Sequence, residues 1–443
     1  MLENGLFFGL FLSVLALSTW LYGKASGGLR RASILSAFYW FYLLIGYVGT
    51  ALLFYRLDPV YVAYGATDRR ILWTLWVNAA LCFLLVPCAA LLVGAPGPTD
   101  SSAAPDKREF RRSPGGYQRV LLWLLVGMSL VPFVFYLRRL AQIPILLLLA
   151  ESSGGLQTAR FESTTGFAGK LHWYSLFFAN ILPFLSYVSF LDFLKRRSDV
   201  FLPLFLVCVF ASVMTLQKAP LVFYLASLVF AYYHCKDKAV PLRTLLLFGG
   251  VLFVAILAMT IRFEGMATQG RGAFEVLYGP LGRTLAGQLT ALYFHYKMFP
   301  HYHPFLWGAS FPNPRGLLPF TPYPVAQEVM KFMQPDAAAS GVIGTAPTVF
   351  YGEMYANFGH LGALASMLLV GMTLGLLQKH LRRGDHVTMA LTVWLAFFLC
   401  RLCLTGLSNF LINLNLVGVL LVAWALRLSS RTAVLAARAS PLT

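Results

Sequence analysis

The chain reads FPHYHPF at residues 299–305, FPNPRGLLPFTPYP at 311–324 and GTAPTVFYGEMYANFG at 344–359. These phrases belong to one polar stretch, residues 262–358, between two apolar segments long enough to cross a membrane. A loop longer than about 15 residues without strong regular structure is usually functional or disordered, and the aromatic content of this one argues against disorder. We therefore interpret the stretch as an active-site cap on a membrane scaffold.

Composition places the rest of the chain in a bilayer. The protein has 443 residues, of which 58% are hydrophobic and 12% are charged, whereas soluble domains carry about 25% charged residues. Apolar runs near 20 residues have the length needed to span a bilayer as helices. The sequence predicts an all-α polytopic membrane protein with about eleven such helices, at 4–22, 33–55, 71–94, 117–137, 171–194, 200–216, 219–234, 241–261, 359–378, 387–408 and 410–428.

Charge sets the expected topology. In a soluble protein, the net charge of +18 would suggest a nucleic-acid partner. Here the basic residues recur in alternate connections, and cytoplasmic loops of membrane proteins are enriched in Lys and Arg. We expect no nucleic acid, no cleavable signal peptide, an outer (periplasmic) N-terminus and a cytoplasmic C-terminus. The expected parts are residues 1–261 with eight spans, the periplasmic cap 262–358, and 359–443 with three spans and a tail.

Two short helices are expected in the cap, at residues 281–299 and 326–333. Leu281, Leu285 and Leu289 recur at helical spacing in the first, which also carries polar side chains. We interpret both as amphipathic helices lying in the membrane interface.

Basic residues on the expected outer side depart from the positive-inside rule. Arg suits phosphate because its planar guanidinium binds two oxygens at once. Arg401 lies within an apolar segment, where an Arg usually faces an interior cavity with a partner. Headgroup contact, a structural ion pair or snorkelling remain open as alternatives. The candidate ligands of a pyrophosphate are Arg160, Lys218, Arg262, Arg283 and Arg401.

Glu353 is the leading candidate for a general base. It stands beside aromatic residues at the expected start of the ninth span, where a partly dry site favours acid–base chemistry; a charge that complements the helix dipole is the alternative. His295 and His303 are further catalytic candidates, although interfacial packing is the favoured interpretation of both. Their spacing lacks a third ligand, so we expect no metal. Candidate glycan contacts are Tyr278, Tyr351, Tyr355 and Asn357.

Three stretches carry a resemblance to a known family. They are TLQKAPLVFYL at residues 215–225, the long outer loop that opens at Arg262, and GTAPTVFYGEMYANFGHLG at 344–362. Here the chain resembles bacterial oligosaccharide repeat-unit polymerases of the O-antigen polymerase (Wzy) type, which are GT-C-like membrane glycosyltransferases.

The resemblance implies an activity in the bacterial inner membrane. It implies a metal-independent enzyme without a cofactor that acts on the periplasmic side. Such an enzyme transfers a growing glycan from one undecaprenyl pyrophosphate onto the repeat unit carried by another, building an O-antigen, capsule or exopolysaccharide. The expected partners are the lipid-linked oligosaccharide and the bilayer, and the resemblance allows for a chain-length-regulating co-polymerase. The alternatives are an O-antigen ligase with lipid A core as acceptor, an enzyme that uses a polyprenyl monophosphate sugar, and a lipid-linked oligosaccharide flippase or transporter.

Overall fold

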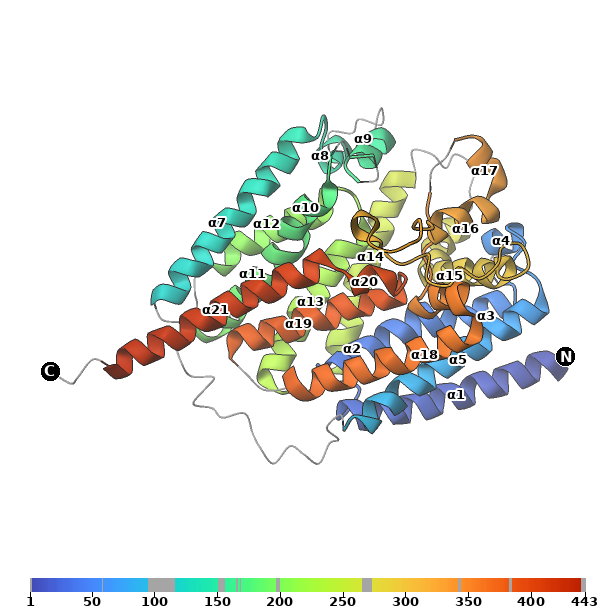
Figure 1. Ribbon diagram of the computed structural model, residues 1–443, viewed down its shortest axis with the longest axis horizontal. Helices are drawn as coiled ribbons and strands as arrows, with labels where there is room; N and C mark the ends of the chain where they lie inside the picture. Colours follow the sequence, from blue (N-terminus) through green and yellow to red (C-terminus); the bar gives the residue numbers. More distant parts are fainter. Residues whose placement is uncertain are drawn as a thin grey trace. The chain divides into compact units, whose positions relative to one another are not determined.

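Helices are the only regular elements in the described residues, in agreement with the all-α class. The chain forms two units, each assembled from stretches that are distant in sequence (Figure 1). The first unit contains Met1–Asp100, Gly270–His380 and Ala396–Asn413, and the second contains Ser101–Gln269, Leu381–Leu395 and Leu414–Thr443. The computed structural model describes residues 2–57, 59–94, 116–149, 156–164, 166–167, 169–196, 200–264, 273–341, 344–381 and 385–439.

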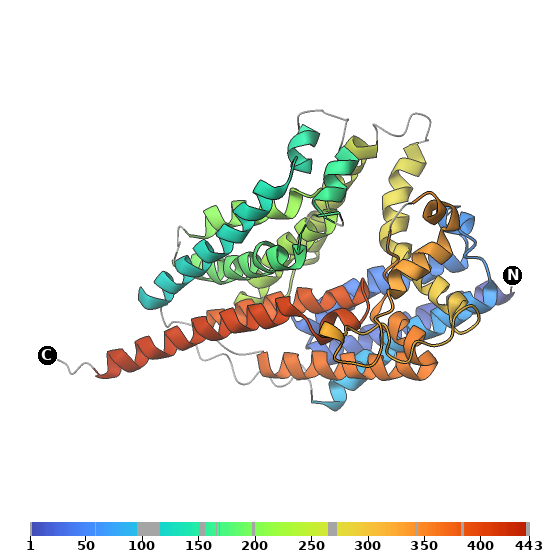
Figure 2. The same ribbon diagram turned by 45° about the horizontal axis from the view of Figure 1, so that its top comes forward.

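Long apolar helices build the first unit. The helices α1 (Leu2–Ser26) and α5 (Arg69–Leu92) pack along each other, and α18 (Phe350–Leu381) lies against α5 (Figures 1 and 2). A further span is continuous through α2 (Ile34–Phe41), the π-helical segment η1 (Tyr42–Val48) and α3 (Gly49–Phe54). The helix α15 (Ala273–Met298) is also long. The shorter elements are α4 (Pro59–Ala63), η4 (Pro314–Gly316), α16 (Val325–Met333), α17 (Pro335–Ala339), η5 (Arg401–Cys403) and α20 (Ser408–Leu411).

Caps fix where some of these helices begin. Ser33 and Ser36 form a reciprocal capping box at the start of α2, and the carboxylate of Asp68 accepts a hydrogen bond from the backbone N–H of Arg70 at the start of α5. Such caps satisfy backbone donors that the first helical turn leaves unpaired.

Glycines allow the closest helix contacts in this unit. Gly371 and Gly375 lie one turn apart on α18, where an added Cβ would come within 2.5 Å of the Val86 carbonyl oxygen and 2.7 Å of the Ala90 Cα on α5. Small residues at this spacing let helix backbones approach closely inside a membrane.

The second unit is also helical. Its elements are α7 (Gly116–Arg139), α8 (Pro144–Leu149), α9 (Leu156–Glu162), the span α10 (Leu171–Ser175), η3 (Leu176–Ile181) and α11 (Leu182–Arg196), then α12 (Phe201–Val213), α13 (Lys218–Lys236), α14 (Leu242–Glu264) and α21 (Leu414–Ala439). The helix α19 (His386–Cys400) passes from the second unit into the first at Ala396.

Eight helices in the described residues have the length and apolar composition of membrane spans, which supports a membrane-embedded protein. They are Leu2–Ser26, Ile34–Phe54, Arg69–Leu92, Gln118–Arg139, Leu171–Lys195, Phe350–Leu381, His386–Cys403 and Ser408–Ser429. Each coincides with one of the eleven expected spans. The other three expected spans correspond to α12, α13 and α14. Phe201–Val213 has only 13 residues, so its ability to cross alone stays a prediction.

The cap differs from a loop without regular structure. The helix α15 takes up 26 of the cap residues, and α18 begins at Phe350, nine residues before the expected span. The helix at 281–299 was expected to lie in the interface, but from Ala286 to Met298 it is buried on nearly all sides against η1, α3 and α5. The second expected short helix, 326–333, is present as α16.

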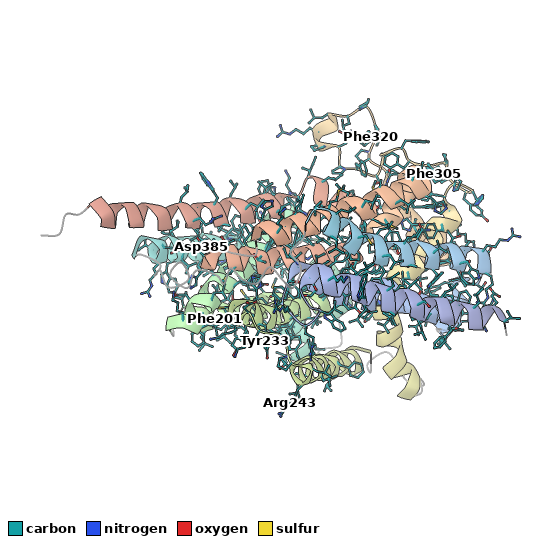
Figure 3. All side chains as sticks on the ribbon, turned by 90° about the horizontal axis from the view of Figure 1, so that it is seen from below. Phe201, Tyr233, Arg243, Phe305, Phe320 and Asp385 are labelled. Carbon is teal, nitrogen blue, oxygen red and sulfur yellow. The ribbon has the colours of Figure 1, made fainter. Side chains whose placement is uncertain are left out.

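An irregular segment, residues 299–324, follows α15. Figure 3 shows Phe305 and Phe320 on it, beside the helices of the first unit. Its backbone pairs with the start of α18, because the N–H groups of Leu306 and Trp307 donate to the carbonyl oxygens of Ala356 and Asn357. This pairing brings the cap to the residues that the sequence singled out around Glu353.

Candidate functional site

Glu353 lies in the first turn of α18 and is only 3% exposed. Its Oε1 accepts a hydrogen bond of 2.9 Å from the Ser310 hydroxyl, and its Oε2 accepts one of 2.9 Å from the Ser408 backbone N–H. Both donors are uncharged. Hydrogen bonds are what make such a buried acid tolerable, because an unpaired buried carboxylate is very costly.

The Ser408 contact depends on a close approach of the chain. An added Cβ at Gly406 would overlap the Oε2 atom of Glu353, so a side chain at this position would displace the carboxylate or the loop. The segment from Leu404 to Ser408 therefore forms one wall of the site.

Asn357 follows Glu353 by one helical turn and faces the same segment of the cap. Its Nδ2 donates to the Ser310 hydroxyl oxygen at 2.8 Å and to the Glu353 carbonyl oxygen at 2.8 Å. Its Oδ1 accepts from the Gly308 backbone N–H at 2.9 Å. One buried amide thus holds the cap backbone and orients the Ser310 hydroxyl toward Glu353.

The backbone beside Ser310 is held in an uncommon conformation. Trp307 has φ of 50° and Gly308 has φ of 94°. Glycine adopts such angles readily, whereas for Trp307 the left-handed region costs on the order of 1 kcal/mol or more. The hydrogen bonds to α18 keep this turn in place.

A kink separates the Glu353 turn from the rest of α18. Gly359 has φ of 65° and ψ of −155°, and the Phe305 ring packs where its Cβ would be. The sequence predicted the span to begin at 359; the helical turns before the kink carry Glu353 and Asn357, and those after it carry the long apolar run.

The helix α15 holds two segments of the site in place through hydrogen bonds of Gln288. The Thr348 hydroxyl donates to the Gln288 carbonyl oxygen at 3.2 Å, and the Gln288 amide nitrogen, oriented toward acceptors, donates to the Leu404 carbonyl oxygen at 3.2 Å. The residues before α18 and the wall 404–408 are therefore fixed to one buried helix.

Arg401 opens η5, at the point where α19 ends, rather than lying inside a continuous helix. It is half-buried, and its guanidinium carbon lies 6.0 Å from the centroid of the Phe398 ring. The Leu404 N–H donates to its carbonyl oxygen, which ties Arg401 directly to the wall 404–408.

The two candidate histidines differ in environment. His295 is 1% exposed, and its Nδ1 lies 2.7 Å from the Ala291 carbonyl oxygen of its own helix. Burial lowers the pKa of His295 to about 4, against the raising effect of that hydrogen bond. This placement suits packing. His303 is partly exposed, and its Nδ1 lies 2.7 Å from the Pro304 carbonyl oxygen.

The candidate glycan contacts Tyr351 and Tyr355 are both buried. The Tyr42 hydroxyl donates to the Tyr351 hydroxyl at 3.3 Å, and the Tyr355 hydroxyl donates to the Phe299 carbonyl oxygen at 3.1 Å. These bonds brace the start of α18. The side chain of Tyr278 lies outside the described residues.

The candidate phosphate ligands are divided between the two units. Arg283 and Arg401 belong to the first, with Arg283 exposed on α15, and Arg160 belongs to the second, exposed near the end of α9. Lys218 and Arg262 also belong to the second unit, and their side chains lie outside the described part of the chain. Convergence of Arg160, Arg262 and Arg401 therefore stays a prediction.

Sequence reasoning missed Ser310, Gly406 and Ser408. Small residues in irregular segments carry no periodicity, so nothing in the sequence distinguishes these three from neighbouring serines and glycines. The spacing of Glu353 and Asn357, four residues apart, was the available signal, because residues i and i+4 share one helix face.

Comparison with models of known protein families finds no match, and searches of curated proteins and of solved structures find no similar chain.

Proposed function

We propose that this protein is a membrane glycosyltransferase that polymerises lipid-linked oligosaccharide repeat units into a surface polysaccharide. The observation that carries the proposal is the Glu353 site. A buried carboxylate with uncharged partners stands at the start of a membrane-spanning helix, and one of its oxygens already accepts a hydrogen bond from a hydroxyl. The same arrangement suits a base that takes a proton from a sugar hydroxyl.

The proposed reaction moves one glycan. The acceptor hydroxyl oxygen forms a bond to the anomeric carbon of the donor, and the bond between that carbon and the pyrophosphate oxygen breaks with its electron pair remaining on the phosphate. The acceptor proton passes to Glu353. Cations near the leaving group stabilise the growing negative charge more in the transition state than in the ground state. Arg401 and Arg283 are the candidates within the first unit.

We place the reaction on the periplasmic side of the bacterial inner membrane. This assignment rests on the alternating basic connections in the sequence. The substrate is then an undecaprenyl-pyrophosphate-linked oligosaccharide, which presents its sugars and pyrophosphate at that surface.

The glycan pattern of a deletion strain tests the proposal. A polymerase predicts that loss of the gene leaves single repeat units attached to their final acceptor, and that the wild-type gene restores a ladder. Complete loss of glycan from lipid A core, with lipid-linked polymer still made, would instead support the ligase. Unchanged ladders would contradict both.

A further inference from the structure

Ser310 covers the carboxylate that the proposed mechanism needs. Glu353 is almost fully buried, whereas Ser310 is only partly buried, and its hydroxyl donates to the Glu353 Oε1 atom at 2.9 Å. In this state an acceptor sugar has no access to that oxygen.

The hydrogen bonds of Ser310 match those expected of a reacting hydroxyl. Its Oγ donates to Glu353 Oε1, and it accepts from Asn357 Nδ2 at 2.8 Å. A hydroxyl that loses its proton to a base and attacks an anomeric carbon needs the same partners, namely an acceptor for its proton and a donor that orients its oxygen. The Asn357 nitrogen is itself fixed by its second bond, to the Glu353 carbonyl oxygen.

We propose that Ser310 occupies the subsite of the acceptor hydroxyl, and that the acceptor glycan displaces Ser310 from Glu353 and Asn357 before transfer. This assignment rests on the proposed function. The cap then closes the site in the absence of acceptor, and the ligand class that opens it is an alcohol carried on a sugar.

The chain next to Ser310 is suited to such a displacement. Trp307 and Gly308 have positive φ, and the Gly308 N–H is held by the side chain of Asn357. Strained residues persist only where surrounding contacts hold them. An acceptor that takes the Nδ2 hydrogen bond of Asn357 removes one of the two hydrogen bonds that hold the Ser310 side chain.

Chemical labelling of Glu353 tests the inference without a sugar substrate. The full-length protein in detergent micelles is treated with a water-soluble carbodiimide and an amine, and modification of Glu353 is followed by peptide mass spectrometry. We expect slow labelling in the wild type and labelling at least about tenfold faster in Ser310→Ala, because a hydrogen bond to a charged group is lost from the closed state. Ser310→Thr, which keeps the hydroxyl, and the distant Ser340→Ala should label like the wild type.

A small alcohol tests whether the subsite takes an external hydroxyl. Ser310→Gly leaves room for a hydroxymethyl group, so methanol should slow the labelling of Glu353 in this variant and leave Ser310→Ala unaffected. Acetonitrile at the same concentration is the solvent control. If Ser310→Ala is recovered unfolded, the rate of Glu353 labelling in Ser310→Gly is compared with that of the wild type instead.

The outcomes separate this inference from the proposed function. Wild-type labelling rates in both Ser310→Ala and Ser310→Gly, or equal effects of methanol and acetonitrile, would overturn the subsite even if the protein makes polymer. Faster labelling of Ser310→Ala and protection of Ser310→Gly by methanol would support the hydroxyl subsite. If the same protein makes no polymer from lipid-linked repeat units, the proposal that it is a polymerase is wrong although the subsite stands.

Discussion

At the scale of residues, the site consists of polar groups that satisfy one another in a largely apolar surrounding. The side-chain oxygen of Asn357 accepts a hydrogen bond from the Gly308 backbone N–H in the cap. Its side-chain nitrogen donates to the Ser310 hydroxyl and to the Glu353 backbone carbonyl oxygen. Loss of one partner would leave the others buried and unpaired, which costs more than the hydrogen bond itself contributes. The site is therefore sensitive to single substitutions on either side of the cap.

His295 predicts a pH dependence of stability. Its pKa of about 4 in the folded protein lies below the ordinary value of about 6.5. Between these values the unfolded chain binds a proton that the folded chain does not, so the free energy of unfolding falls as the pH falls through this window, by about 3 kcal/mol in total. Unfolding in detergent micelles between about pH 7 and about pH 4 measures this slope.

The matched variant is His295→Gln, which does not titrate there and can still donate to the Ala291 carbonyl oxygen. We expect it to lose the His295 part of the slope. An identical slope in wild type and variant would show that other groups cause the acid sensitivity.

Arg401 is expected to need its guanidinium. Arg401→Ala should abolish polymer formation, and Arg401→Lys should be poorly tolerated, because an ammonium cannot bind two phosphate oxygens at once. Transfer should persist in EDTA, since fixed cations stabilise the leaving pyrophosphate. Polymer formation by purified variants measures this, and full activity of well-folded Arg401→Ala would make the residue structural.

At the scale of elements, α18 joins the membrane scaffold to the cap. Hydropathy predicted this span and the seven others that coincide with candidate spans, because about twenty apolar residues are needed to cross a bilayer. It could not predict the helical turns before Gly359, where Pro347, Gly352 and Gly359 argue against a regular helix. Tertiary pairing with residues 306–310 decides their conformation.

The same limit applies to the site. Glu353 and Asn357 could be selected as unusual polar residues beside a span, whereas Ser310 and Ser408 are identified only by long-range contacts. The burial of α15 could not be predicted for a related reason, because its Arg283, Gln288 and Lys297 indicated a polar face while tertiary packing buries the helix from Ala286 onward.

The contact between α18 and α5 gives a prediction for this element. Gly371→Ala would place a methyl group against the backbone of Val86, and overpacking of this kind costs about 1–3 kcal/mol. The control is Gly127→Ala on α7, where nothing lies within 4 Å of the added atom. Thermal unfolding in micelles should show a loss for Gly371→Ala alone. Equal stability of the two variants would contradict the close packing of α18 on α5.

At the scale of the whole molecule, charge and hydropathy together predict one orientation in the membrane. The predicted orientation uses the eleven expected spans, eight of which coincide with candidate spans in the described residues, because eleven crossings place the basic connections on one side. Strongly basic connections mark the cytoplasmic side of a membrane protein, and the cap, which contains the Glu353 contacts, is expected on the other.

Reporter fusions test this orientation. Fusions at Arg112, Arg197 and Arg383 should report the cytoplasm, and fusions near Gly270 and Pro335 should report the periplasm, because these positions fall in basic connections and in the cap respectively. A cytoplasmic report from Gly270 or Pro335 would contradict a periplasmic active site.

The most direct measurement is polymer formation by purified protein supplied with lipid-linked repeat units, compared between wild type and Glu353→Gln. The glutamine amide can keep a hydrogen bond at this position but cannot take a proton from the acceptor. We predict a glycan ladder from the wild type and from the control Glu328→Gln, a partly exposed glutamate paired with Lys331. Turnover should be lower by about 10²–10⁴-fold in folded Glu353→Gln. A normal ladder from Glu353→Gln, or no ladder from folded wild-type protein, would contradict the assignment of Glu353 as the base of a membrane glycosyltransferase.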